Sequence, residues 1–129
     1  MAQPSTLYRF RLDVSDIDRG VYESFDLRVA KHPSETEQFL VTRLLAYALA
    51  YEQDIELTAA GLSDADAPAL RAPGIHGTTK LWIEIGNPSA RKLHKASKAA
   101  ENVKVFTYKD PQLLLNDMRS EKVHRAESI

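Results

Sequence analysis

The stretch "LWIEIGNPSARKLHKASKAAENVKVFTY", residues 81–108, decides the fold of this chain. It opens with a short apolar run, continues with a basic segment that has helical spacing, and ends with the β-branched and aromatic run "VKVFTY". Asn87 is the expected N-cap of the helix and Pro88 its first residue. The pattern predicts a strand, a helix and a second strand, which together form a βαβ unit with a right-handed crossover.

The segments before this unit predict a hairpin and a long helix. Apolar and polar side chains alternate in "LYRFRLDV", and "VYESFDLRVA" resumes a strand pattern after the turn "SDIDRG". The helix is expected from Ser34 to about Glu52, because Ser34 and Glu37 have the spacing of a capping box. Its apolar stripe indicates that it is largely buried.

The remaining segments complete a mixed α/β pattern. The run "DIELTAAG" predicts a short strand, residues 62–80 predict a long loop, and a last helix is expected from Pro111 onwards. The order is hairpin, helix, strand, strand, helix, strand, helix. We therefore expect one domain over residues 1–129, with a central mixed sheet flanked by helices.

Composition limits the classes of protein to which the chain can belong. Its 129 residues are 43% hydrophobic and 27% charged, which are globular values. The net charge of −1 gives no general attraction to nucleic acid or to an anionic membrane, so any such binding must come from a local patch. The absence of cysteine excludes disulfides and thiolate metal sites. No signal peptide or membrane-spanning run of about 20 apolar residues is evident, and a cytoplasmic protein is expected.

Glu84 is the residue of this sequence that most needs a chemical explanation. It shares one face of its strand with Trp82 and Gly86, while three aliphatic residues point the other way. If its face is partly open to water, Glu84 is an ordinary solvated residue. If both faces are covered, the carboxylate needs a cation or a metal. The pattern supports both interpretations, and the position at a strand end favours a ligand site.

The helix of the βαβ unit carries a basic run: Arg91, Lys92, His94, Lys95 and Lys98. Such a run is most often the solvated face of an amphipathic helix. Proximity supports a second interpretation, since Lys92 and Lys95 lie one to two turns after the strand of Glu84.

Other chemical motifs are weak or absent. Asp64 and Asp66 in "SDADAP" are typical turn formers, and would suit Mg²⁺ or Mn²⁺ only if carboxylates converge there. The histidines have no metal-binding spacing. No G-x-S-x-G motif and no glycine-rich phosphate loop is present, so serine hydrolase and P-loop or Rossmann readings have no support.

Three stretches in this order resemble the YaeQ family of bacterial proteins: "HPSETEQFLVTRLLAYAL", "GLSDADAP" and "LWIEIGNPSARKLHKAS". The similarity extends from "LYRFRLDVSDIDRGVYE" to about Tyr108. It implies a variant of the PD-(D/E)XK nuclease core, in which a helix, strands carrying the acids, a crossover helix and a further strand follow one another. The resemblance also implies further strand-like sequence past the position of Ile129, so the chain is expected to be either a truncated form or a shortened relative that lacks a C-terminal strand region.

The resemblance implies roles for the acidic residues. Asp66 matches the first acidic position of the nuclease pattern and Glu84 matches the acid of the E-x-K element, so these two would hold Mg²⁺ or Mn²⁺. Glu35 resembles the extra helix-borne acid of part of the superfamily, which implies a catalytic role for it.

The basic residues follow from the same resemblance. Gly86 stands where the lysine of the E-x-K element is expected. In some members of the superfamily this lysine has moved to the following helix, where Lys95 is the first candidate and Lys92 the second. Arg91, Lys92 and Lys98 would hold a nucleic-acid backbone.

Two functions remain open on the sequence alone. The first is Mg²⁺-dependent phosphodiester hydrolysis on DNA or RNA, in which Lys95 orients the nucleophile or stabilises the developing negative charge. The second is a catalytically silent PD-(D/E)XK-like domain that binds or regulates a protein partner, with Glu84 and Lys95 as a buried ion pair.

Overall fold

The computed structural model describes residues 6–57 and 67–129. Two compact units divide the chain, one over residues 1–35 and the other over residues 36–129. Each unit is described by itself below, and the single domain expected over residues 1–129 stays a prediction. Among the described residues, no helix combines the length and apolar character that crossing a membrane requires.

The first unit is the expected β-hairpin. Strands β1 (Thr6–Asp16) and β2 (Val21–Lys31) pair antiparallel along their whole length. Cross-strand partners lie on the same face, so Phe10 opposite Leu27 belongs to an apolar face, and Arg11 opposite Asp26 belongs to a charged one. The connecting turn ends at Gly20, whose φ of +68° suits a residue without a Cβ.

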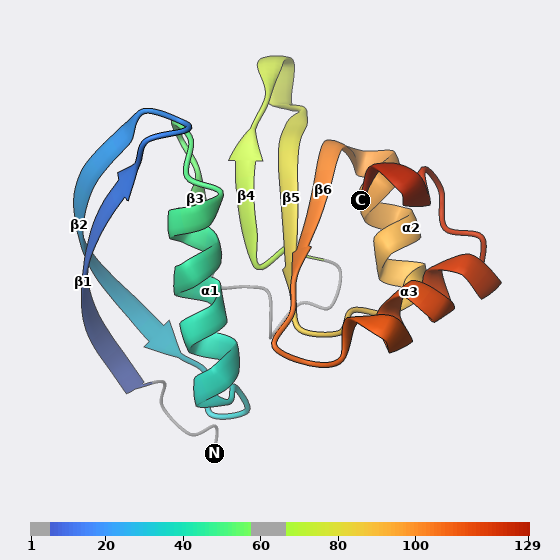
Figure 1. Cartoon of the computed structure of the whole chain (residues 1–129), viewed down its shortest axis with the longest axis horizontal. Coiled ribbons are helices and arrows are strands. Elements are labelled where there is room, and N and C mark those ends of the chain that lie inside the picture. Colours follow the sequence, from blue (N-terminus) through green and yellow to red (C-terminus); the bar gives the residue numbers. More distant parts are fainter. Residues whose placement is uncertain (1–5, 58–66) are drawn as a thin grey trace. The chain divides into compact units, whose positions relative to one another are not determined.

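The second unit is built on a four-stranded sheet in the order β3-β4-β5-β6 (Figure 1). Its strands are β3 (Glu56–Leu57), β4 (Leu70–Pro73), β5 (Thr79–Ile85) and β6 (Ala100–Phe106). Neighbouring strands are antiparallel except for β5 and β6, which are parallel. Helix α2 (Ala90–Ala99) connects these two, so the βαβ unit and the mixed α/β class are confirmed.

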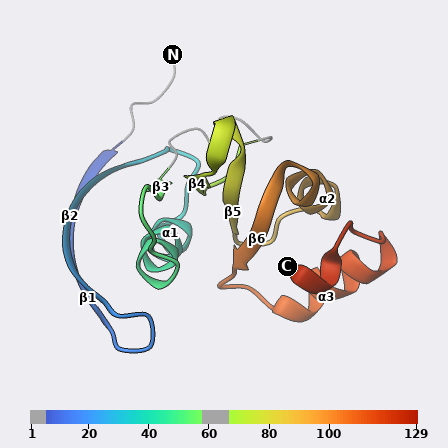
Figure 2. The ribbon, with the colours of Figure 1, turned by 90° about the horizontal axis from the view of Figure 1, so that it is seen from above.

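Helices cover both faces of this sheet. Figure 2 shows α1 (Glu37–Leu49) on one side, and α2 with α3 (Pro111–Ser120) on the other. Alternate residues of β5 point to opposite faces of the sheet. Ile83 packs in the core on the α1 side, and Trp82 packs in the core formed with α2 and α3. Short 3₁₀ turns, η1 (Ile75–Gly77) and η2 (Ala126–Ser128), complete the unit. The central strand is therefore covered on both faces.

The prediction of a long loop over residues 62–80 is wrong for residues 67–80, the part that the structure describes. Leu70 to Pro73 form β4, which pairs with β5 along the edge opposite to β6. The 3₁₀ turn η1 follows. The strand is four residues long and ends in proline, so it lacks the alternating run by which strands are recognised. The strand expected to end at Gly61 is described only as β3, and its remainder lies outside the described residues.

Both predicted helix caps are displaced by two residues. Thr36, not Ser34, caps α1 by accepting the Phe39 N–H, and Ser89, not Asn87, caps α2. Ser34 instead lies 2.6 Å from the His32 ring, within a tight turn that precedes the helix. Helix α1 also ends at Leu49 rather than at Glu52.

The burial of α1 is incomplete. Leu40 and Leu44 are buried as expected, but Val41, Leu45 and Leu49 are 49%, 52% and 60% exposed. The buried part of the apolar face of this helix is therefore narrower than the sequence indicates.

The packing of β5 gives a stability prediction. Ile83 has no exposed surface, so Ile83→Ala should lower the free energy of unfolding by about 2–5 kcal/mol through lost burial and an unfilled cavity. Ile75→Ala is the matched control, because Ile75 is 76% exposed and its loss should change stability by about 0.5 kcal/mol or less. Urea unfolding measures both, and equal effects of the two substitutions would contradict this core.

Candidate functional site

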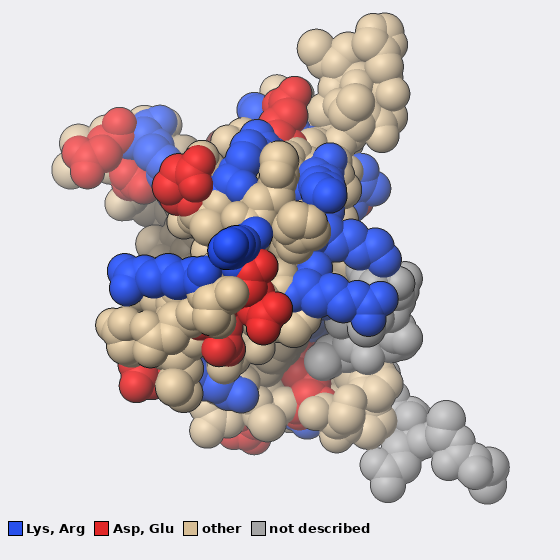
Figure 3. Space-filling model, turned by 90° about the vertical axis from the view of Figure 1, so that its right-hand side faces the viewer, with Lys and Arg blue, Asp and Glu red and all other residues tan. Residues whose placement is uncertain are grey.

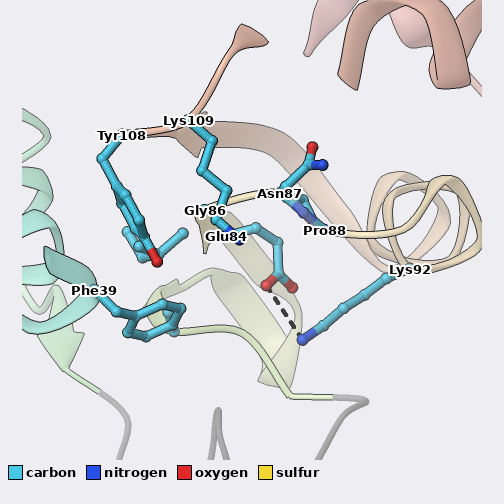
Figure 4. A pocket seen from close by; sticks show the side chains of 10 residues that line it. Phe39, Glu84, Gly86, Asn87, Pro88, Lys92, Tyr108 and Lys109 are labelled. Atoms are coloured by element: carbon cyan, nitrogen blue, oxygen red, sulfur yellow. Dashed lines mark ion pairs between the residues drawn. The ribbon is translucent and has the colours of Figure 1, made fainter. Parts of the chain in front are cut away.

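A pocket of about 230 Å³ lies beyond the carboxyl ends of the parallel strands β5 and β6. The residues after β5 form one part of its wall, and those after β6 form another. Its lining includes Phe39, Glu84, Gly86, Asn87, Lys92, Tyr108 and Lys109 (Figure 4). In α/β sheets, ligands bind in crevices at this end of parallel strands, so this pocket is the candidate site.

Glu84 is buried at the end of β5, with 4% of its surface exposed. Its Oε2 accepts the indole N–H of Trp82 at 2.7 Å, and its Oε1 lies 3.2 Å from Nζ of Lys92. Trp82 is two residues earlier on the same strand, so the two side chains lie on one face. Of the two interpretations of Glu84, the structure supports the one in which both faces of the strand are covered and the carboxylate has a cationic partner.

Burial raises the pKa of the Glu84 carboxyl above its ordinary value. The hydrogen bond from Trp82 and the positive charge of Lys92 act in the opposite direction, but they do not cancel the loss of solvent. The site therefore holds a carboxylate that is costly to ionise, and whose charge depends on the neighbouring lysine.

Lys92 reaches Glu84 because α2 starts close to the end of β5. It is the third residue of the helix, its backbone N–H donates to the cap hydroxyl of Ser89, and its side chain is 21% exposed. Lys95 lies one turn, about 4.5 Å, further along the axis and is exposed. The ion-pair partner of Glu84 is thus Lys92, which the sequence ranks second to Lys95, and the catalytic role of Lys95 stays a prediction.

Gly86 explains why no lysine stands two residues after Glu84. Its φ is +86°, in the left-handed region that side chains other than glycine rarely adopt, and its N–H donates to the Phe106 carbonyl at 2.9 Å. The chain leaves β5 through this conformation. A cation for Glu84 therefore has to come from another element, and α2 provides it.

The aromatic and basic residues after β6 were not singled out from the sequence. Tyr108 and Lys109 line the pocket because the ends of parallel strands meet at one edge of the sheet. Phe39, from the first turns of α1, joins them. The βαβ pattern indicated the edge of the sheet, but nothing in the sequence placed Phe39 there.

The other predicted site residues are distributed differently. Asp66 lies outside the described residues. Glu35 belongs to the first unit, where it is 4% exposed and accepts the backbone N–H of His32 at 3.2 Å. Arg91 and Lys98 are exposed on α2, and Figure 3 shows basic side chains among acidic ones on the face over α2 and α3. In the part of the chain that the structure describes, no three His, Asp or Glu residues form a group able to hold a metal.

The fold and the pocket define a mixed α/β domain with a polar site at the carboxyl ends of two parallel strands. The family model described as YaeQ protein matches residues 1–129, and the chain belongs to the YaeQ family.

Relatives of known sequence and structure agree with this assignment. The chain is 36% identical over 108 residues to the uncharacterized protein YaeQ of Escherichia coli strain K12, a match that covers 84% of this chain and 59% of the relative. The match to the uncharacterized YaeQ of Shigella flexneri has the same extent. The chain thus spans about three fifths of the length of these curated relatives.

Two solved structures share the fold. The crystal structure of the YaeQ protein from Pseudomonas syringae superposes with a TM-score of 0.82 at 41% identity, covering 90% of this chain and 64% of that one. The crystal structure of the YaeQ protein from Xanthomonas axonopodis pv. citri superposes with a TM-score of 0.82 at 33% identity, covering 92% of this chain and 67% of that one. The agreement extends over most of this chain and about two thirds of each relative.

The raised pKa of Glu84 fixes the sign of a pH effect on stability. The folded chain binds this proton more tightly than the unfolded chain does. The contribution of Glu84 to the free energy of unfolding therefore falls as pH rises from the ordinary pKa of 4.5 through the raised value.

Lys92→Met should raise the pKa of Glu84 further and extend this fall to higher pH, because the compensating charge is lost. Above the raised pKa, the variant should be less stable than wild type by roughly 1–3 kcal/mol, and the difference should shrink in acid. Carbon-13 NMR titration of the glutamate carboxyls and urea unfolding at several pH values measure the two effects. Lys98→Met, on the exposed side of the same helix, is the control, and the same response in both variants would contradict the pair.

Proposed function

We propose that the second unit is a PD-(D/E)XK-like domain that hydrolyses phosphodiester bonds of nucleic acid with the help of Mg²⁺ or Mn²⁺. The observation that carries the proposal is the Glu84–Lys92 pair, an acid at a strand end with a lysine supplied by the next helix. A pocket opens beside this pair. An acid and a lysine in contact at such a position are the chemical elements of the E-x-K motif, with the lysine moved to α2.

The order of elements supports this proposal. Helix α1, the antiparallel strands β4 and β5, the crossover helix α2 and the parallel strand β6 follow one another as in the nuclease core described above. Strand β4, which the sequence pattern missed, supplies the partner that makes β5 the second strand of a hairpin-like pair. Fold likeness alone never assigns an activity, so the argument depends on the residues at the end of β5.

The described residues alone do not make a metal site. Glu84 is the one carboxylate among the described residues that line the pocket, and a hard divalent cation takes several oxygen ligands. The proposal therefore takes Asp66, which lies outside the described residues, as the further ligand that the family resemblance implies. When bound, Mg²⁺ neutralises charge on a phosphodiester oxygen and lowers the pKa of water.

The side chains present have defined tasks in this proposal. Glu84 has two of its four lone-pair positions directed at Trp82 and Lys92, which leaves others for a cation. Lys92 then stabilises negative charge on the phosphodiester beside the buried Glu84 carboxylate. Arg91 and Lys98 contact the nucleic-acid backbone from the exposed side of α2, so binding should weaken as salt is added.

A catalytically silent binding domain is the second candidate. The observation that favours it is the partnership of both Glu84 oxygens, one with Trp82 and one with Lys92, which satisfies a buried carboxylate without a metal. In this case the pair serves the packing of α2 on the sheet, and the function lies in a surface that binds a protein.

Metal binding separates the two candidates. Calorimetry with Mn²⁺ should give saturable heat for the wild type, and little or none for Glu84→Gln or Asp66→Asn, because each substitution removes a charged oxygen ligand. Glu84→Gln keeps the side-chain volume and an acceptor for Trp82. Glu101→Gln, at an exposed position of β6, is the control that should bind like wild type.

Hydrolysis of a labelled oligonucleotide in Mn²⁺ tests the lysine. Lys92→Met should lower the rate by about 10²–10³-fold, the usual effect of losing one donor to a developing negative charge. Lys95→Met measures whether the residue ranked first by the sequence contributes, and Lys122→Met, at an exposed position outside the pocket lining, is the surface control. If the wild type neither binds Mn²⁺ nor cleaves any nucleic acid, hydrolysis is excluded and the silent domain is favoured.

A further inference from the structure

Two aromatic rings, those of Tyr108 and Phe39, lie close to Gly86 in the lining of the pocket. A Cβ built on Gly86 would lie 3.8 Å from a ring carbon of Tyr108 and 3.9 Å from a ring carbon of Phe39. Tyr108 is 39% exposed, so part of its ring is available to a ligand. The rings come from α1 and from the segment after β6, which are far apart in the sequence. Because Gly86 carries no side chain, it leaves the space beside these rings unfilled among the described residues.

The opposite part of the pocket is polar. Figure 4 shows the two rings on one side of the Glu84 carboxylate and the Lys92 side chain on the other. Asn87 also lines the pocket, as does Lys109, whose Nζ lies 5.8 Å from the centroid of the Tyr108 ring and therefore on the aromatic side. Two ammonium groups and one carboxylate leave a net positive charge in the pocket, which favours a ligand with negative charge, while the rings favour a flat unsaturated group.

A nucleotide has both properties within one unit. Its base stacks on aromatic side chains, and its phosphate contacts lysines. The pocket volume of about 230 Å³ lies below the ~300–1,000 Å³ of ordinary small-molecule sites, so it has room for one base but not for the width of a helix. A base inside a duplex has both faces stacked on its neighbours and is not free to contact Tyr108.

We infer that the pocket takes an unpaired nucleotide, and that the substrate class is single-stranded nucleic acid with its base against Tyr108 and Phe39. The inference rests on the proposed function in one respect, namely that Lys92 binds a phosphate of the nucleic acid. The stacking of the base on Tyr108 and Phe39 can be tested without any hydrolysis. DNA and RNA share the chemistry used here, so the experiment includes both.

The test is fluorescence anisotropy of a short labelled oligonucleotide in EDTA, as single-stranded DNA, as single-stranded RNA and as a blunt duplex. Either single strand should bind more tightly than the duplex. Tyr108→Leu should weaken single-strand binding by about 5- to 150-fold and leave duplex binding nearly unchanged. Tyr108→Phe should bind like wild type, because the ring remains. Tyr22→Leu is the control, since Tyr22 is 62% exposed on the hairpin and lies outside the pocket.

The outcomes separate this inference from the proposed hydrolysis. Equal binding of duplex and single strand, an unchanged affinity in Tyr108→Leu, or no binding of any oligonucleotide overturns the inference, whatever the metal experiments give. Tyr108-dependent binding of single strands in a protein that shows no Mn²⁺ binding upholds the inference and overturns the hydrolysis. Circular dichroism checks that each variant is folded, so that differences in affinity do not come from unfolding.

Discussion

The carboxylate of Glu84 contacts both the indole N–H of Trp82 and the ammonium of Lys92, and this contact joins the sheet, the helix and the pocket of the second unit. A charged group with 4% of its surface exposed is costly unless polar partners replace the lost water. Trp82 supplies a donor from the same strand, and Lys92 supplies positive charge from the start of α2. The packing of α2 on the sheet is therefore coupled to the ionisation of one side chain.

The parallel pairing of β5 and β6 determines where chemistry can occur in this unit. It brings the segments after both strands to one edge of the sheet, where neither is covered by further strands in the described residues. Gly86 turns the chain at this edge with a φ of +86°, which side chains other than glycine rarely adopt, so a lysine is disfavoured there. The same glycine keeps the space open between the carboxylate and the aromatic rings. One backbone conformation thus accounts for the displaced lysine and for the shape of the pocket.

Sequence patterns succeeded where neighbouring residues encode the structure. The alternation in the hairpin and the strand–helix–strand order of residues 81–108 depend on contacts repeated along each element, so their periods identify them. They failed for β4, whose four residues form a strand through pairing with β5 and not through their own pattern. The caps were misplaced because several Ser, Thr and Asn residues near each helix start can serve, and the turn before the helix selects one.

For the candidate site, the sequence by itself determined that a carboxylate lies in an apolar strand beside a basic helix, and it named Glu84 and Lys92 among the residues concerned. Only the tertiary structure decided that Lys92, and not Lys95, is the ion-pair partner of Glu84, because the two lysines differ by one turn in distance from the strand end. It also brought both Phe39 and Tyr108 close to Gly86. Contacts between such distant segments arise from packing, which no local pattern records.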